Sequence, residues 1–186
     1  KPGDYALVLV DTAGTSVDNI RLFYKAGSQS VSGLNNNWLQ VGSVDWQKTR
    51  AVAVGDASVS TAGLTVVFDG YSPISSTGST VTSLAADINS AMNSYGVYAE
   101  VNSDGFLVLF VTNDARVLGP SEAKTGSITV TSGLTTLGIA NGTYYAPYLF
   151  YGSYAAEPAG GWYSTDTQPR PTGSIWWKTT STGGGW

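Results

Sequence analysis

The sequence predicts an α+β fold: a mainly antiparallel β-sheet, one principal helix packed on a face, and an irregular aromatic-rich C-terminal arm. Charged residues form only 12% of the chain, well below the usual ~25%, and the many Gly, Ser and Thr residues suit strands and turns. One segment has helical periodicity, whereas several others alternate as strands do. Eleven of the 22 aromatic residues lie in 144–186, which sets this part apart from the rest.

A helix is predicted at the start of the stretch 80–112, where apolar residues recur at steps of three and four and therefore share one face. These residues are Val81, Leu84, Ile88 and Ala91 or Met92. Thr82 or Ser83 is expected to cap its N-terminus. Gly96 is expected to end it in the left-handed conformation. The apolar face must be buried, so the helix should pack on a sheet.

A β-hairpin is predicted directly after the helix. Residues 97–101 and 106–112 alternate as strands, and the Asp104-Gly105 pair between them favours a tight turn. The central unit is therefore a helix followed by a hairpin.

Shorter strands are predicted on both sides of this unit. The candidate strands are 5–10, expected to be buried, then 20–25, 38–44, 51–54, 64–69 and 127–131. Residues 45–50 should form a turn, 71–79 the connection to the helix, and 114–125 a surface loop that contains Gly119-Pro120. Residues 134–139 should form an apolar turn that places Leu134, Leu137 and Ile139 on the core.

We expect a β-rich α+β domain over 1–143, with the helix–hairpin module at about 64–139, and a C-terminal arm over 144–186. The chain starts without Met and ends at Gly183-Gly184-Gly185-Trp186. We therefore expect the natural protein to continue beyond this fragment.

The composition argues against most enzyme classes. The chain has no His and no Cys, which removes Ser-His-Asp and Cys-His catalysis, imidazole metal sites and zinc–thiolate sites. Its carboxylates are scattered, mostly in turns, so a carboxylate-pair glycosidase is a distant alternative. We expect no enzyme, and no catalytic, cofactor-binding or metal-binding residues.

The charge and hydropathy patterns also limit the partners. The net charge is −4 with no basic run, so the chain has little electrostatic basis for binding nucleic acid. No apolar run approaches the ~18 residues that a membrane-spanning helix needs. We expect neither nucleic acid nor membrane as a partner.

The aromatic arm is the candidate interaction site. The candidate interface residues are Tyr148, Tyr151, Trp162, Trp176 and Trp177. Tyr and Trp are enriched at protein interfaces, but the same rings could stack on sugars or pack against the arm's own sheet. Trp176 and Trp177 are adjacent, so an extended backbone places them on opposite sides.

The central stretch resembles the "IN" module of bacterial hook-associated and flagellin-like proteins, and it is similar to insertions in virion proteins of large tailed phages. The segments that carry this resemblance are LAADINSA (84–91), VYAEV (97–101), DGFLVL (104–109), GSITV (126–130) and LGI (137–139). PTGSIWWKTT (171–180) also resembles stretches of phage structural proteins.

This resemblance implies a structural component of a tailed-phage virion, specifically a surface-exposed domain of the contractile tail sheath protein. Its partners would be other copies of itself and other virion proteins, its location the phage tail, and no cofactor would be needed. We expect the isolated fragment to be monomeric, since it has no coiled-coil heptads. The alternative is a phage fibre or adhesin domain that binds host surface glycan.

Overall fold

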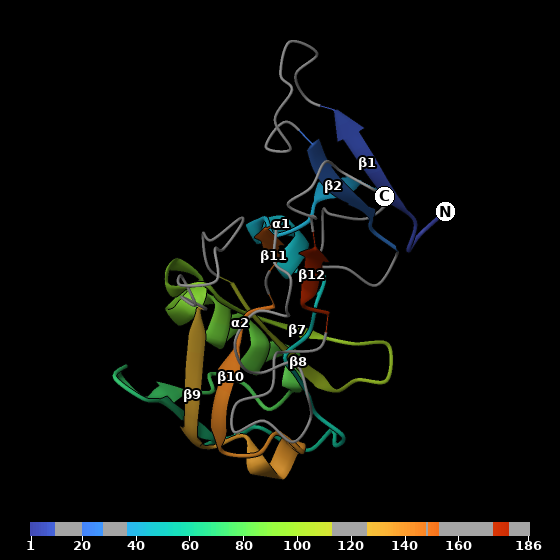
Figure 1. Cartoon of the computed structure of the whole chain (residues 1–186). Helices are drawn as coiled ribbons and strands as arrows, with labels where there is room; N and C mark the ends of the chain where they lie inside the picture. Colours follow the sequence, from blue (N-terminus) through green and yellow to red (C-terminus); the bar gives the residue numbers. More distant parts are fainter. Residues whose placement is uncertain (10–19, 28–36, 113–125, 148, 153–172, 179–186) are drawn as a thin grey trace.

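A computed structural model of the chain describes residues 1–9, 20–27, 37–112, 126–147, 149–152 and 173–178 (Figure 1). The predicted α+β class is confirmed: ten strands form three antiparallel sheets beside one main helix. A further pair of strands, from the C-terminal arm, is parallel. None of the helices within these ranges is long and apolar enough to span a membrane.

The strand orders are β1-β2-β3, β4-β8-β7, β10-β9-β5-β6 and the pair β11-β12. The strands are β1 (Tyr5–Leu9), β2 (Ile20–Lys25), β3 (Trp38–Gln40), β4 (Ala53–Val54), β5 (Thr65–Phe68), β6 (Ile74–Ser75), β7 (Val97–Val101), β8 (Leu107–Val111), β9 (Ser127–Ser132), β10 (Gly142–Tyr145), β11 (Leu149–Gly152) and β12 (Ile175–Lys178). The helices are α1 (Val44–Gln47), α2 (Val81–Met92) and the 3₁₀ turns η2 (Asn93–Tyr95) and η3 (Thr135–Leu137).

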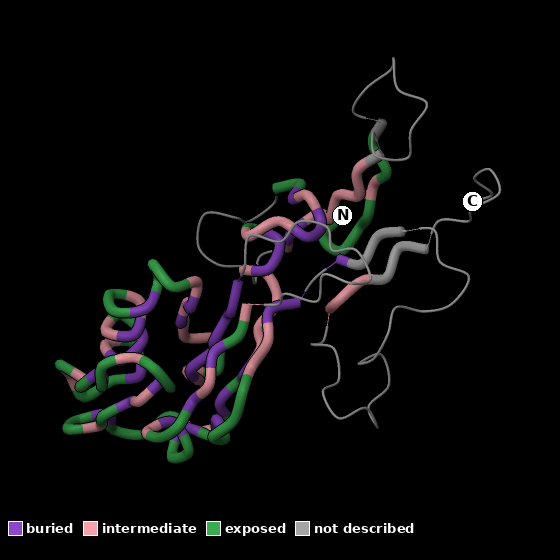
Figure 2. Tube along the Cα trace, turned by 60° about the vertical axis from the view of Figure 1, so that its left-hand side comes forward, coloured by how far each residue is buried: buried purple, intermediate pink, exposed green. Residues whose placement is uncertain are grey.

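Two lobes are visible in Figures 1 and 2, each with its own cluster of buried apolar residues. The small lobe holds β1, β2, β3, α1, β11 and β12 around Ala26, Leu39, Val41, Trp46 and Leu149. The large lobe holds the remaining elements around a core to which α2 and strands β4–β9 contribute. The chain passes between the lobes after α1 and again after β10.

The predicted helix face forms the centre of the large core. Leu84 and Ile88 are fully buried and Met92 almost so, whereas Ala91 is exposed. The helix packs mainly on β7, whose inward residues Val97 and Ala99 are also buried. The apolar residues that recur every three or four positions along α2 therefore pack on the apolar residues that alternate along β7, as the sequence predicts.

The predicted N-cap is wrong by two or three positions. Thr80 caps α2: its hydroxyl accepts a hydrogen bond from the Ser83 amide, and the Ser83 hydroxyl accepts one from the Thr80 amide. This is a capping box with Ser at the third helical position. Gly96 does end the helical region with φ 81°, but only after the extra turn η2.

Asn89 fixes α2 on the sheet. Its side-chain Nδ2 donates to the carbonyl of Ala99 at 2.7 Å, and its Oδ1 accepts from the Ala99 amide at 2.8 Å. The amide side chain thus pairs with β7 as a neighbouring strand would, while the adjacent Ile88 enters the core. These two hydrogen bonds satisfy the backbone N–H and C=O of Ala99, which would otherwise be covered by the helix without a partner.

The hairpin and the apolar turn are confirmed. β7 and β8 pair in antiparallel register, and the Asn102 side chain accepts from the amides of Asp104 and Phe106 to stabilise the turn. Leu134, Leu137 and Ile139 are buried at η3. The expected surface loop at 114–125 lies outside the described residues.

Four strands were not predicted, β6, β10, β11 and β12, and one predicted property is wrong. The residues of β6 are predicted as a connection, those of β10 as loop and arm, and those of β11 and β12 as part of the arm. The first strand forms, but it is not buried: Leu7 is 52% exposed, and Tyr5 and Val8 are also exposed. β1 is the edge strand of a small sheet, and the small core lies beneath β2 and β3 instead.

The domain division stays a prediction. The expected boundary after residue 143 falls inside β10, which pairs with β9 in the large lobe.

Candidate interaction surfaces

The arm is joined to both lobes at its start. The Ala146 amide donates to the Gly126 carbonyl at 2.7 Å, and Ala146 is buried in the large core. The next residue, Pro147, accepts a 2.9 Å hydrogen bond from Nε2 of the buried Gln47 on α1. Leu149 is then buried in the small core. The aromatic arm therefore begins as an integral part of the fold.

The parallel pairing of β11 with β12 was not predicted, although an extended arm was. Leu149 lies opposite Ile175, Phe150 opposite Trp176, and Tyr151 opposite Trp177. Leu149 is buried and Ile175 packs against the same core. The face of the β11–β12 pair that carries these two residues is therefore directed toward the small core. Because strand positions alternate between faces, positions 150 and 176 lie on the opposite face.

The five candidate interface residues are thus only partly placed. Tyr148 and Trp162 lie outside the described residues. Of Tyr151, Trp176 and Trp177 the structure describes the backbone, which puts Tyr151 beside Trp177 on one face and Trp176 on the other. The sequence expectation that Trp176 and Trp177 take opposite faces agrees with the strand they form.

In the small lobe, the Arg50 side chain contacts three aromatic residues. Its Nη2 donates to the Tyr5 hydroxyl at 3.1 Å, and its guanidinium carbon lies 4.6 Å from the ring centroid of Tyr24 and 5.3 Å from that of Trp46. Within the described ranges no carboxylate forms an ion pair with it. A Cβ placed on Gly173 would lie 2.7 Å from Arg50 Cδ, so the chain entering β12 runs directly against this side chain.

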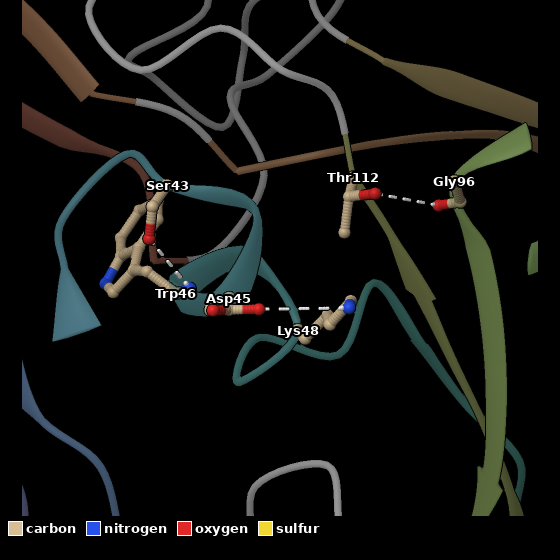
Figure 3. Close-up of polar contacts among 6 residues, drawn as sticks. All are labelled: Ser43, Asp45, Trp46, Lys48, Gly96 and Thr112. Carbon is tan, nitrogen blue, oxygen red and sulfur yellow. Dashed lines mark hydrogen bonds and ion pairs between the residues drawn. The ribbon is translucent and has the colours of Figure 1, made fainter. Parts of the chain in front are cut away.

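Lys48 in the small lobe contacts Tyr98 in the large lobe. Figure 3 shows Lys48 beside Asp45 at the end of α1, and the Lys48 Nζ lies 3.8 Å from the Asp45 Oδ1. The same Nζ lies 4.4 Å from the ring centroid of Tyr98 on β7. The same view shows Ser43 capping α1 by accepting from the Trp46 amide, and Thr112 donating to Gly96 beside the sheet. Cation–π contact on Tyr98 favours one relative placement of the lobes.

The sheet β1-β2-β3 exposes apolar side chains on the face away from the small core. Tyr24 and Leu22 pack against the core, so the alternating residues Phe23, Arg21 and Lys25 occupy the other face. Val8 lies opposite Arg21, and Trp38 lies opposite Lys25. Trp38 is 48% exposed, and its ring centroid is 5.7 Å from the Lys25 Nζ. We call Val8, Arg21, Phe23, Lys25 and Trp38 the outer face.

The outer face is not predicted from the sequence, because the apolar run of the first strand indicates a buried strand. The sequence of β2 indicates this surface, because its apolar residues fall on both faces of the strand: Leu22 and Tyr24 on one, Phe23 on the other. A strand that is apolar on both faces lies either inside a core or at a contact surface.

A hollow of about 490 Å³ lies between the start of α2 and the β7–β8 turn. Its lining is Ser58, Val59, Ser60, Ser79, Thr80, Val81, Thr82, Val101 and Gly105. It has hydroxyl groups but no charged or aromatic side chain, so it lacks the ring platform that a sugar site commonly uses.

Two observations concern the acidic and phenolic groups of the described residues. They contain no cluster of three or more acidic, His or Cys side chains that could hold a metal ion. Burial raises the pKa of the Tyr144 phenol, which therefore stays a neutral donor to the Ala140 carbonyl at 2.8 Å. The expectation of no enzyme remains a prediction.

Comparisons of the chain with known protein families, with curated proteins and with solved structures find no match. The resemblance to hook-associated and phage virion proteins therefore stays a prediction, which depends on the segments quoted from the sequence.

Proposed function

We propose that this chain is a structural domain of a tailed-phage virion, a surface-exposed part of the contractile tail sheath protein. The observation that carries an assembly role is the outer face of the β1-β2-β3 sheet, on which Val8 and Trp38 are exposed, while Tyr5 and Leu7 are exposed on the other face of the same sheet, opposite Tyr24 and Leu22. Contiguous exposed apolar patches usually mark contact surfaces. The assignment to a virion and to its sheath depends on the sequence resemblance.

The placement of the arm supports the same role. Its first strand is anchored in the small core through Leu149, and its pair β11-β12 has a second face at positions 150 and 176. Aromatic residues at such positions suit a subunit contact, since Trp and Tyr dominate the energetics of interfaces.

The location in the particle can be tested by labelling purified tails with an antibody raised against this chain. A sheath domain should be labelled along the whole tail. Labelling only at distal fibre tips would support the fibre or adhesin alternative instead, and absence of the chain from purified particles would refute both.

Replacing Trp176 by Ala should separate assembly from folding. Position 176 lies on the face away from Leu149 and Ile175, so the melting temperature of the isolated chain should change by no more than a few degrees. The same substitution in the full-length protein should impair particle assembly. Circular dichroism and counting of intact tails by electron microscopy measure the two effects.

Ile175→Ala is the matched control, because Ile175 packs against the small core. It should lower the melting temperature more than Trp176→Ala does. If Trp176→Ala leaves assembly intact and abolishes binding to host cells, the arm is a glycan site. If it changes neither property, the arm has no role in contacts.

The isolated chain should be a monomer at micromolar concentration in physiological salt. The sequence has no coiled-coil heptads that would hold a trimer, and the exposed large apolar residues of the described part are divided between the β1-β2-β3 sheet and the separate positions Val54, Val59 and Tyr95. Static light scattering measures the molar mass directly. A stable trimer would instead support the fibre reading.

A further inference from the structure

The sequence contains a single Asn-Gly pair, Asn141-Gly142. In such a pair the backbone nitrogen of the glycine can attack the side-chain amide carbon of the asparagine, because glycine has no side chain that crowds the approach. The attack closes a succinimide ring and releases ammonia. Water then opens the ring at either carbonyl, which leaves aspartate or isoaspartate. Neither step needs an enzyme or a cofactor.

The structure leaves Asn141 accessible to this reaction. Asn141 and Gly142 are both exposed, and a Cβ built on Gly142 would meet no atom within 4 Å. None of the described residues forms a hydrogen bond with the Asn141 side chain. Gly142 is the first residue of β10, the last strand in the order β10-β9-β5-β6. The end of such a strand opens at little cost in free energy, which frees the Gly142 amide for the attack.

The other asparagines in the described part of the large lobe are held or shielded. Asn89 makes two hydrogen bonds to Ala99. The Oδ1 of Asn102 accepts from two backbone amides in the hairpin turn. Asn93 is exposed, but its backbone is helical, with φ −57° and ψ −37°, which does not bring the next amide nitrogen onto the side-chain carbon. All three precede a serine, whose side chain hinders the attack.

One contact restrains the segment around Asn141. The Tyr144 hydroxyl donates to the Ala140 carbonyl at 2.8 Å, so this hydrogen bond closes a loop of the chain that contains Asn141 and Gly142. The Tyr144 ring packs against the large core, which fixes the position of the hydroxyl. Cyclisation requires the Asn141 backbone to rotate until the Gly142 nitrogen faces the side-chain carbon. The hydrogen bond opposes this rotation.

We propose that Asn141 undergoes spontaneous deamidation in the folded chain, at a rate that the Tyr144–Ala140 hydrogen bond restrains. Asn141 supplies the amide carbon, Gly142 the attacking nitrogen, and water the oxygen of the new carboxylate. Isoaspartate also lengthens the main chain by an extra carbon, directly before β10 pairs with β9. The inference goes beyond the proposed virion role and does not depend on it.

The first measurement follows the full chain during incubation at physiological temperature in mildly alkaline buffer, by peptide mapping with mass spectrometry. Peptides that contain residue 141 should gain mass as NH2 is replaced by OH, and part of them should carry isoaspartate. Over the same period Asn89, Asn93 and Asn102 should stay unconverted. Absence of conversion at 141, or equal conversion at all of these positions, would overturn the proposal.

Asn141→Gln is the matched control, because it keeps the side-chain amide but must close a larger ring, which forms far more slowly. No conversion is expected at this position over the same period. Conversion of the glutamine to the same extent as Asn141 would refute the succinimide route.

Tyr144→Phe tests the restraint, because it keeps the ring in the core and removes only the hydroxyl donor. Burial raises the pKa of the Tyr144 phenol, so the wild-type donor stays protonated in mildly alkaline buffer. Loss of one hydrogen bond of ordinary net strength should speed conversion at Asn141 about fivefold. Conversion at Asn89 should not rise, which distinguishes release of this segment from unfolding of the lobe. A rate that is unchanged at Asn141, or that rises equally at Asn89, would overturn the restraint.

Discussion

Replacing Ile88 by Asp should abolish folding of the large lobe. Ile88 is 0% exposed at the centre of α2, and the core around it contains no described basic side chain that could pair with a carboxylate. A buried unpaired charge costs several kcal/mol, which is a large part of the about 5–15 kcal/mol that stabilises a typical domain. Thermal unfolding followed by circular dichroism measures the loss.

Ala86→Asp is the matched control, since Ala86 lies two positions away on the exposed side of the same helix. It introduces the same side chain at a cost of up to about 0.7 kcal/mol in helix propensity. A variant Ile88→Asp that melts within a degree or two of the wild type would show that this face of α2 is not in the core.

The elements that the sequence predicts well are those with local signals. The spacing of Leu84, Ile88 and Met92 and the Asp104-Gly105 turn act within a few residues, and both the helix and the hairpin form as predicted. The predicted N-cap is wrong because hydroxyl residues lie on both sides of Val81, Ser79 and Thr80 before it and Thr82 and Ser83 after it. Which of them takes the cap depends on the backbone at Thr80, which is extended with φ −117° and ψ 152°.

The elements that were missed depend on pairing between distant segments. β6 has only two residues and forms as a strand because it pairs with β5. β11 pairs in parallel with β12, a partner that no local pattern identifies. β1 has the apolar run of a buried strand, and only the sheet order reveals that it is an edge strand.

The candidate surfaces could be predicted only in part, because they too depend on pairing between distant segments. The sequence identifies the arm by its aromatic residues, but the register of β11 and β12 determines which positions share a face. The outer face combines residues from β1, β2 and β3, so only the fold brings Val8, Phe23 and Trp38 together.

Replacing Gly133 by Ala should destabilise the large lobe strongly, because two costs combine at this position. Gly133 follows β9 with φ +95°, where an L-residue is strained. A Cβ there would also clash with the Thr65 carbonyl oxygen and lie 2.7 Å from the Val66 Cα. Both belong to β5, which is paired on its two sides with β6 and β9 and so resists displacement.

We expect Gly133→Ala to cost about 2–5 kcal/mol, the sum of left-handed strain and overpacking. Gly63→Ala separates the two terms, because Gly63 has a similar φ of +72° but no atom within 4 Å of the added Cβ. Its cost should be about 1–2 kcal/mol, from backbone strain alone. Urea denaturation of both variants measures the difference, and equal losses of stability would contradict the close packing of Gly133 on β5.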